Sequence, residues 1–212
     1  MVSARTIGRL SLYRRLLNEM QAEGALSVYS HDLAAKAGVT AAQVRRDVMS
    51  VGYTGSPTRG YSVPGLAEAI GEFLDAPEPQ SVALVGVGNL GRAILAFFSG
   101  RRPKLSVVAT FDSDPNKVGR VIHGCRCYAV DEIETRLAEL GVGVAILTVP
   151  AGAAQEVAER LVRAGVKGIL NFAPVPLRLP RTVFVEDIDM TVSLEKVAYF
   201  ARQGAARKEW NR

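Results

Sequence analysis

The stretch SVALVGVGNLGRAILAFF, residues 81–98, decides the fold of most of the chain. A buried type of β-strand precedes the pattern Gly-x-Gly-x-x-Gly, and an apolar helical run follows it. In this context Gly86 permits a tight turn, Gly88 lets a pyrophosphate approach the backbone, and Gly91 lets the helix pack closely on the strand. The amides at the helix start then hold the phosphates. The stretch predicts a Rossmann-type dinucleotide-binding domain with contacts from Gly86, Val87, Gly88, Asn89, Leu90 and Gly91.

A carboxylate follows the next predicted strand, residues 105–111. Asp112 lies 21 positions past Gly91, where such domains place the acid that binds the adenosine ribose. An acid there repels a 2′-phosphate and favours NAD(H) over NADP(H), a preference that Lys117 and Arg120 nearby reduce. Further strands at 144–149 and 168–172 end in loop formers, and ligands lie beyond the carboxyl ends of parallel strands. We therefore expect Thr148, Val149, Pro150, Asn171 and Ala173 at the nicotinamide end, with Ser113, Lys117 and Pro174 completing the cofactor site.

The residues after position 80 lack the acid–base pair that a dehydrogenase needs beside its hydride acceptor. They hold one histidine, His123, in a turn-like stretch, and no tyrosine of the chain is followed four positions later by lysine. Little sequence is left for a substrate domain. We expect NADH or NAD to be bound without turnover, so that the protein is not an enzyme. An NAD-dependent oxidoreductase with an accessory N-terminal domain is the alternative.

Residues 1–63 carry eight Lys or Arg against four Asp or Glu, a balance compatible with a nucleic-acid partner. Apolar residues at three- and four-residue spacing predict an amphipathic first helix. Residues 30–51 then read as helix, tight turn at Gly38, and helix, which is a helix-turn-helix. The first-helix residues that face inward are Ile7, Leu10, Tyr13, Leu17 and Met20.

The second helix of that pair is suited to reading a DNA groove. Val44, Val48 and Val51 share its inner face, and an Arg pair with a Gln is left to point outward. Arginine pairs with guanine and glutamine with adenine in the major groove. The spacing of Thr40 and Gln43 is that of a capping box, with Gln43 reaching back to the Thr40 amide. An ordinary helical bundle with a charged surface is the alternative.

Residues 52–63 are rich in turn formers and aromatics, and they predict a small hairpin, or wing. Arg59 lies near its tip, where it enters the minor groove or grips a phosphate; a plain loop cation is the alternative. Together these segments form a winged helix-turn-helix. Its expected DNA contacts are Thr40, Gln43, Arg45, Arg46, Ser50, Tyr53, Gly55 and Arg59.

Residues 75–80, with two prolines, suit an exposed connection between folding units. We place the DNA-binding domain at 1–76, the Rossmann domain at 77–190 and a C-terminal helix at 191–212. That helix has an apolar face, and a second copy of the chain is a plausible cover for it. Two-fold symmetry of such a homodimer suits a palindromic double-stranded DNA site. A dinucleotide-binding interaction module that never contacts DNA is a further alternative.

The composition, 48% hydrophobic and 22% charged, is that of a globular protein and excludes disorder. The chain has no apolar run of about 18 residues and no signal-peptide core, so we expect a cytoplasmic protein without a membrane partner. Cys125 and Cys127 alone complete neither a disulfide framework nor a zinc site. We expect no metal and two surface thiols, with an oxidant-sensing or metal-binding role in a dimer as the less favoured alternative.

Motifs in order along nearly the whole chain resemble those of the Rex redox-sensing transcriptional repressors of bacteria. The resemblance implies a homodimer of winged helices and Rossmann domains, with the C-terminal helix swapped into the partner. It also implies that DNA is bound when NADH is scarce and released when NADH binds. The motifs are TAAQVRRD (40–47), GVGNLG (86–91), FDSDP (111–115), LTVP (147–150), KGILNFAPV (167–175) and EDID (186–189).

The resemblance also implies switch residues. Asp189 matches an acid that changes partners between the two states, and one of its partners is an arginine of the first helix, here Arg15. Phe97 stands where relatives often have a tyrosine that hydrogen-bonds this acid. The wing, residues 55–61, is shorter than the usual glycine-rich form.

Overall fold

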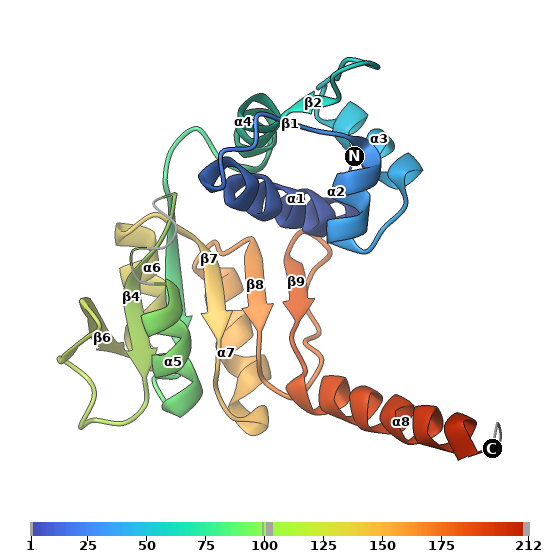
Figure 1. Cartoon of the computed structure of the whole chain (residues 1–212). Coiled ribbons are helices and arrows are strands. Elements are labelled where there is room, and N and C mark those ends of the chain that lie inside the picture. The colour runs from blue at the N-terminus through green and yellow to red at the C-terminus, as the bar shows by residue number, and fades with distance from the viewer. Residues whose placement is uncertain (1, 99, 101–103, 210–212) are drawn as a thin grey trace. The chain divides into compact units, whose positions relative to one another are not determined.

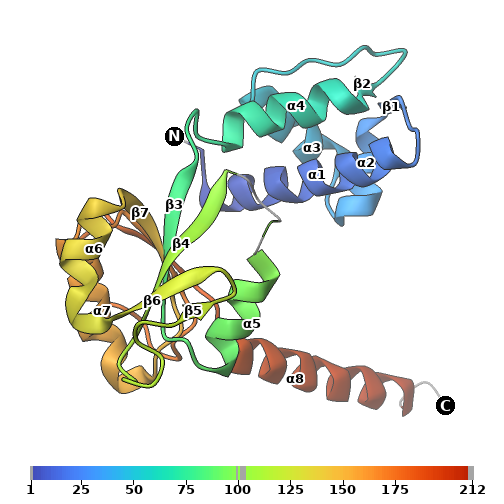
Figure 2. The same cartoon turned by 90° about the vertical axis from the view of Figure 1, so that its left-hand side faces the viewer.

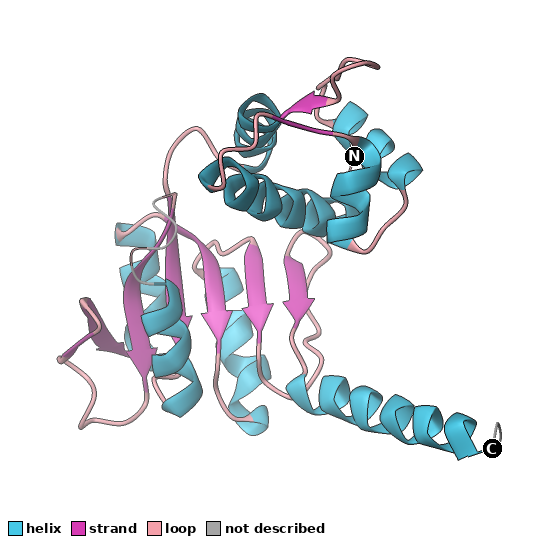
Figure 3. Ribbon diagram, in the orientation of Figure 1, coloured by secondary structure: helices cyan, strands magenta, loops and turns pink. Residues whose placement is uncertain are grey.

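The computed structural model describes residues 2–98, 100 and 104–209, which form two compact units divided between Glu78 and Pro79. The first unit is helical with one small antiparallel sheet, and the second is a largely parallel sheet with helices on both faces (Figures 1 and 3). A winged helix-turn-helix followed by a Rossmann-type sheet is therefore confirmed as the fold class. None of the described helices is long and apolar enough to cross a membrane.

The first unit is built on the long helix α1, which packs against the other three helices. Four of its five predicted inward residues are buried, whereas Ile7, in the first turn, is exposed, so the prediction is wrong there. Val44 and Val48 of α3 are fully buried in the same core, as the sequence pattern predicts. The elements are α1 (Ala4–Ala22), β1 (Ser27–Val28), α2 (Ser30–Ala37), α3 (Ala41–Ser50), β2 (Tyr61–Ser62) and α4 (Val63–Leu74).

The wing is a hairpin only at its tip. Ser56 and Gly60 exchange two backbone hydrogen bonds of 2.8 Å, which close a loop over residues 57–59. The returning strand β2 then pairs with β1 and not with residues 52–55 as a simple hairpin requires. Gly60 permits this course because its φ is +72° and a Cβ there would lie 2.5 Å from the Val28 carbonyl oxygen. The wing is thereby anchored on the segment that leads into α2.

The second unit begins at the centre of its sheet. Among the described residues the strand order is β5-β6-β4-β3-β7-β8-β9, with β5 as the one antiparallel member. The chain leaves β3 toward one edge and returns to build the other, so the order reverses beside β3. Ligands bind at such a reversal, beyond the carboxyl ends of the strands. The strands are β3 (Gln80–Val85), β4 (Leu105–Asp112), β5 (Val121–Ile122), β6 (Cys125–Ala129), β7 (Val142–Leu147), β8 (Gly168–Asn171) and β9 (Phe184–Asp187).

Helices cover the two faces of this sheet unequally (Figure 2). α6 and α7 pack on one face through residues such as Leu137 and Leu161, and α5 packs on the other through Ile94 and Leu95. The alternating apolar strands and helices predicted from the sequence are therefore confirmed. The helices are α5 (Asn89–Phe98), α6 (Ile133–Glu139), α7 (Ala151–Arg163) and α8 (Met190–Glu209), with a 3-10 turn at Val130–Glu132 before α6.

The expectation of surface thiols is wrong. Cys125 and Cys127 lie two residues apart on β6, so both side chains point to the same face of the sheet. That face packs under α5, and the two side chains are 8% and 0% exposed. Burial raises the pKa of both thiols, which disfavours the reactive thiolate.

The last helix, α8, extends away from the sheet (Figure 1). Its large apolar side chains are exposed, with Leu194, Val197 and Phe200 each about two-thirds accessible. An exposed apolar face of this kind marks an interaction surface. The predicted swap of this helix into a partner subunit stays a prediction.

Candidate nucleotide and nucleic-acid sites

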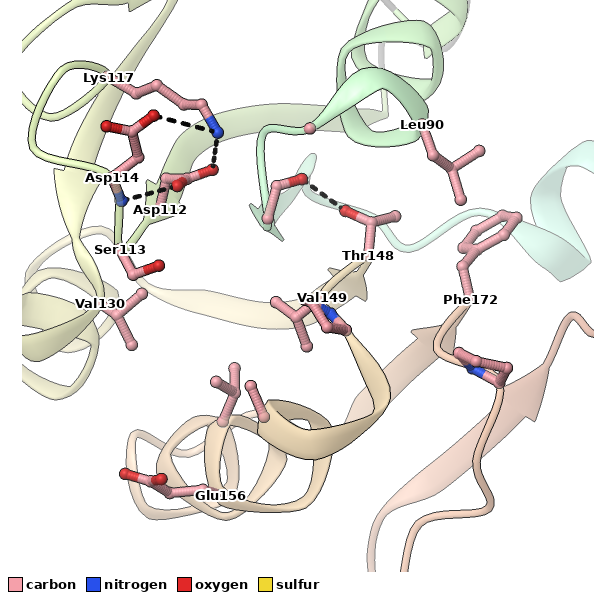
Figure 4. Close-up of a pocket in the computed structure, with 16 residues that line it drawn as sticks. Leu90, Asp112, Ser113, Asp114, Lys117, Val130, Thr148, Val149, Glu156 and Phe172 are labelled. Atoms are coloured by element: carbon pink, nitrogen blue, oxygen red, sulfur yellow. Dashed lines mark hydrogen bonds and ion pairs between the residues drawn. The ribbon is translucent and has the colours of Figure 1, made fainter.

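A cavity of about 690 Å³ lies at the carboxyl ends of the central strands (Figure 4). Its volume is within the range of ordinary small-molecule sites. Most of the predicted cofactor residues line it: Gly86, Gly88, Leu90, Asp112, Ser113, Lys117, Thr148, Val149, Pro150 and Pro174.

The glycine loop has the geometry that its three glycines were expected to provide. Gly86 adopts φ +98°, and a Cβ there would lie 2.6 Å from the Thr148 carbonyl oxygen. A Cβ on Gly91 would overlap the carbonyl oxygen of Gly86, so only glycine lets α5 start this close to β3. A Cβ on Gly88 meets nothing within 4 Å. The space beside Gly88 is therefore open to a ligand that approaches the backbone.

Asp112 is held rigidly at the end of β4. Its carboxylate accepts hydrogen bonds from the Val87 amide at 2.7 Å, the Asp114 amide at 2.9 Å and Lys117 Nζ at 3.0 Å. Lys117 lies between two carboxylates, because its Nζ is also 3.8 Å from Asp114 (Figure 4). Val87 thus serves the site through its amide while its side chain is buried in the core.

Acid groups dominate the charge of this cavity. Its ionisable lining residues are Asp112, Asp114, Lys117 and Glu156. Hydrogen bonds from the amide and side chain of Asn116 hold the pKa of Asp114 below its ordinary value, which keeps this carboxylate charged at neutral pH. A net negative rim disfavours a ligand with an additional phosphate near Asp112.

The loops after β7 and β8 differ in what they present to the cavity. Thr148 Oγ1 donates to the carbonyl oxygens of Gly86 at 2.7 Å and Val85 at 3.0 Å, which ties this loop to the glycine loop. Asn171 is buried behind the cavity, where it donates to Asp187 at 2.7 Å and accepts from the Ala173 amide at 3.0 Å. Asn171 and Ala173 therefore shape the loop and do not line the cavity; Asn89 and Gly91 are also not among its lining residues.

Sequence reasoning missed part of the cavity wall. Ala153 and Val157 are four residues apart on α7 and present one face of that helix, so tracing the helical period past Pro150 would have found them. Phe172, immediately after the buried Asn171, would have followed from strand alternation. The missed lining residues are Asp114, Val130, Ala153, Glu156, Val157 and Phe172.

The exposed face of α3 carries the arginine pair predicted for DNA. Arg45 and Arg46 are exposed, as is Ser50, which donates to the Asp47 carbonyl oxygen at 2.6 Å. Arg45 Nη1 donates to Ser30 Oγ at 3.1 Å, and Arg46 Nη2 donates to Gln43 Oε1 at 2.9 Å. Both guanidinium groups are therefore oriented by side chains of the same unit.

Only one of the two hydrogen bonds predicted for the capping box forms. Thr40 Oγ1 accepts a hydrogen bond from the Gln43 amide at 3.1 Å, as predicted. The Gln43 side chain does not return to the Thr40 amide but donates to Asp47 Oδ1 at 2.8 Å. It is drawn there because Asp47, whose side chain is 3% exposed, is a buried carboxylate that needs several donors.

Arg9 of α1 is the main partner of Asp47. Its Nε and Nη2 donate to the two carboxylate oxygens at 2.6 and 2.8 Å, and Tyr13 Oη adds a third bond at 3.0 Å. Burial alone would raise the pKa of Asp47, but the hydrogen bonds from Arg9, Gln43 and Tyr13 outweigh it and hold that pKa below its ordinary value. Burial and the hydrogen bond to Asp47 raise the pKa of the Tyr13 hydroxyl.

The wing is braced by an aromatic residue that the sequence did not single out. Tyr29, at the N-terminus of α2, donates from its hydroxyl to the Thr58 carbonyl oxygen at 2.7 Å. Arg59, next to Thr58, is exposed at the tip. Tyr53 is half-buried with its ring 6.3 Å from that of Tyr61, and a Cβ on Gly55 would overlap the Tyr61 ring. Tyr53 and Gly55 thus contribute to the base of the wing.

The predicted switch residues occupy defined local positions. Arg15 is exposed on α1 in the first unit. In the second unit Asp189 caps α8, with its Oδ1 accepting from the Val192 amide at 2.9 Å. Phe97 is 55% exposed and meets the Phe98 ring edge-on. A contact between Arg15 and Asp189 stays a prediction.

Comparisons with known proteins agree with this two-part arrangement. A family model described as a putative DNA-binding protein N-terminus matches residues 1–48, and one described as a CoA binding domain matches residues 77–175. The redox-sensing transcriptional repressor Rex of Carboxydothermus hydrogenoformans is 40% identical over 198 residues, which cover 93% of this chain and 95% of the relative.

Solved structures extend the similarity to the whole chain. The Rex-family repressor RSP in complex with β-NAD⁺ and operator DNA is 32% identical, with a TM-score of 0.89 and coverage of 100% of this chain and 97% of that one. RSP in complex with β-NADH gives a TM-score of 0.87 at the same identity, covering 99% and 98% of the two chains. The chain belongs to the family of Rex redox-sensing transcriptional repressors.

Proposed function

We propose that this protein represses transcription by binding operator DNA and releases that DNA when NADH binds. One observation carries the proposal: a single chain joins a basic winged helix-turn-helix to a dinucleotide-type cavity, and matches over its full length a relative solved with NAD⁺ and operator DNA. The signal that it reads is the NADH/NAD ratio.

On the DNA side, we assign base reading to Arg45 and Arg46, because both extend from the exposed face of α3. Arg59 at the wing tip enters the minor groove or contacts a phosphate. The other contacts we assign to the surrounding surface, at Thr40, Ser50, Tyr53 and Gly55. These contacts position the protein on the duplex.

On the cofactor side, the residues present fit a dinucleotide. The open space at Gly88 lies at the start of α5, where backbone amides bind a pyrophosphate. Asp112 receives the adenosine ribose, and the negative rim selects NAD(H) over NADP(H). The dinucleotide supplies a redox state to be sensed, and the protein residues bind it and orient it.

The remaining assignments follow from the same reading. We divide the chain into a DNA-binding domain at 1–76, a cofactor domain at 77–190 and a dimerisation helix at 191–212. Exposed Leu194, Val197 and Phe200 on α8 support a homodimer, which suits a palindromic site. We further propose that the protein acts in the cytoplasm and does not turn over the cofactor, as a ligand-controlled repressor requires neither export nor catalysis.

Mechanistically, NADH and DNA favour different arrangements of the same dimer, so each weakens the binding of the other. Such couplings are reciprocal and amount to about 1–3 kcal/mol, or roughly 5- to 150-fold in affinity. Arg15, Phe97 and Asp189 are our candidates for contacts that differ between the arrangements.

The test is a fluorescence-anisotropy titration of a palindromic promoter fragment with and without saturating NADH or NAD⁺. We expect NADH to raise the dissociation constant at least about fivefold, and NAD⁺ to leave it lower than NADH does. Tight binding that is equal in all three conditions contradicts sensing but preserves DNA binding. NADH consumption on addition of small carbonyl compounds would favour the oxidoreductase alternative.

A further inference from the structure

We propose that Gln43 is a positioning residue that connects the buried Asp47 to the exposed Arg46 and so sets the direction in which Arg46 reads a base. This inference rests on the DNA-binding half of the proposed function. It reassigns Gln43, which the sequence suggests as an adenine reader, to a role inside the protein. It also gives Asp47 a function beyond holding two helices together.

The relay begins in the core of the first unit. Asp47 lies on the inner flank of α3, and its carboxylate is clamped by both donor groups of the Arg9 side chain on α1. A bidentate arginine–carboxylate pair fixes geometry as well as energy. Tyr13 from the same helix adds a third donor. The Asp47 carboxylate is therefore a fixed reference point for every side chain that bonds to it.

Gln43 transmits this position to the surface. Its Nε2 donates to Asp47 Oδ1 at 2.8 Å, and its Oε1 accepts from Arg46 Nη2 at 2.9 Å. A carboxylate only accepts and a guanidinium only donates, so the amide has one orientation that satisfies both neighbours. Spacings of three and four residues place all three side chains on one flank of α3.

The same bonds argue against Gln43 as a base reader. Glutamine recognises adenine through both its amide oxygen and its amide nitrogen. Each group already holds one partner, and the partner of the amide nitrogen is a buried carboxylate. One N–H and one lone pair remain, but their direction is fixed by Asp47 and Arg46, so turning the amide to pair with adenine would strain both bonds. Arg46 in contrast keeps further N–H groups for a guanine edge while one Nη is held.

Arg45 provides an internal comparison. It is adjacent to Arg46 and is also exposed, but its guanidinium is held by Ser30 of α2 and not by the relay. A change in Gln43 should therefore affect readout by Arg46 and leave readout by Arg45 unchanged. This difference makes the proposal testable by a pair of double-mutant cycles.

The experiment measures operator and non-specific DNA affinity of the full-length protein for Gln43→Met, Arg46→Ala, Arg45→Ala and the two double variants that contain Gln43→Met. Methionine keeps the length of glutamine and removes its hydrogen bonds. We expect Gln43→Met alone to weaken operator binding about fivefold, the net worth of one hydrogen bond, and to leave non-specific binding unchanged. In the Arg46→Ala background the same substitution should have no further effect, whereas in an Arg45→Ala background it should keep its full cost.

Three results would overturn the inference. Equal costs of Gln43→Met with and without Arg46 would show that Gln43 contacts DNA itself. No cost in either background would show that Arg46 needs no positioning. An equal loss of operator and non-specific binding, with a lowered melting temperature, would reduce Gln43 to a structural residue. Failure of the unmodified protein to bind the operator is a separate outcome, which overturns the proposed function and this inference with it.

Discussion

The cofactor cavity and the DNA-reading helix are specified in opposite ways. The cavity is framed by backbone: three glycines, two of them irreplaceable on steric grounds, and loops at the ends of parallel strands. The reading helix is framed by side chains, in a chain of hydrogen bonds from Arg9 through Asp47 and Gln43 to Arg46. The cofactor cavity therefore depends on the positions of the backbone turns, and the DNA-reading face of α3 depends on the buried carboxylate of Asp47.

This difference determines how each site should fail. A site framed by the backbone loses its ligand when one added atom fills the narrow space between two backbone segments, even if every polar group is kept. A site framed by side chains loses accuracy step by step as bonds in the relay are removed. The predictions below test that contrast from the largest expected effect to the smallest.

Gly91→Ala should have the largest effect. The new Cβ would overlap the Gly86 carbonyl oxygen, so α5 must move away from β3 and the glycine loop must open. We expect a loss of about 3 kcal/mol in unfolding free energy and at least about a 100-fold loss in NADH affinity. Urea denaturation and isothermal titration calorimetry measure the two quantities.

Gly88→Ala is the matched control for this substitution. Its Cβ meets no atom within 4 Å, so stability should stay within about 0.5 kcal/mol of the unmodified protein. NADH binding should still weaken, since the methyl group occupies the space given to the pyrophosphate. If Gly88→Ala binds NADH normally, the assignment of that space is wrong.

Asp47→Ala should come next in size. It leaves Arg9, Tyr13 and Gln43 without their common acceptor, at a cost of about 2 kcal/mol. Chemical denaturation measures this loss. Asp32→Ala, the same change at an exposed acid of the neighbouring α2, should cost no more than about 0.5 kcal/mol. Similar values for the two variants would contradict the role given to the buried pair.

The same network predicts a pH dependence. Because the folded-state pKa of Asp47 is depressed, its contribution is complete above the unfolded-state pKa of about 4 and is lost as pH falls through the lower folded-state value. The stability difference between the unmodified protein and Asp47→Asn should therefore be full at pH 6 and should shrink below about pH 4. A difference that stays constant down to pH 2 would exclude the ionised carboxylate as its source.

Asp112→Asn should alter selectivity more than folding. It removes the charge that repels a 2′-phosphate and loosens Lys117, which then becomes available to such a phosphate. We expect the ratio of the NADPH to the NADH dissociation constant to fall about tenfold, equivalent to about 1.4 kcal/mol. Calorimetric titration of both dinucleotides measures the ratio.

Asp114→Asn is the control for charge alone. It removes the same charge from the same rim, but Asp114 does not bond the glycine loop and lies 3.8 Å from Lys117. Its effect on the ratio should be smaller, about threefold at most. If both variants change the ratio equally, the general charge of the rim selects the ligand and Asp112 has no special role.

These contrasts also explain what the sequence could predict. Local spacing predicts the roles of Gly86, Gly91 and Asp112, because the strand, turn and helix that they join are consecutive in the chain. The helical period of α7 and the alternation that continues past β8 indicate which way Val157 and Phe172 face. That these faces meet the cavity depends on how α7 and β8 pack beside β3. Cys125 and Cys127 were misplaced for a related reason, since the five residues of β6 give no sign that α5 covers their face of the sheet.

The reading helix α3 also has features that local sequence patterns predict and others that depend on distant residues. Its apolar face and Thr40 cap follow from spacing within ten residues, but the fate of Gln43 depends on Arg9, which is 38 residues before Asp47. The backbone at the start of α3 and the buried Asp47 carboxylate compete for the side-chain amide of Gln43. The amide bonds to Asp47 because an unpaired buried charge costs more free energy than an unpaired group at a helix end. The wing strand β2 likewise depends on its distant partner β1 and not on residues 52–55.

Tyr29→Phe should give the smallest effect and the sharpest test of the wing. It removes the bond from the Tyr29 hydroxyl to the Thr58 carbonyl oxygen, an exposed contact of 2.7 Å, and leaves the ring in place. We expect operator affinity to fall about threefold with no change in melting temperature, since one exposed hydrogen bond contributes about 0.5–1 kcal/mol. In an Arg59→Ala background the substitution should have no further effect, because the brace acts by holding the tip that carries Arg59. A full cost in that background would mean that the Tyr29 hydroxyl contacts DNA directly.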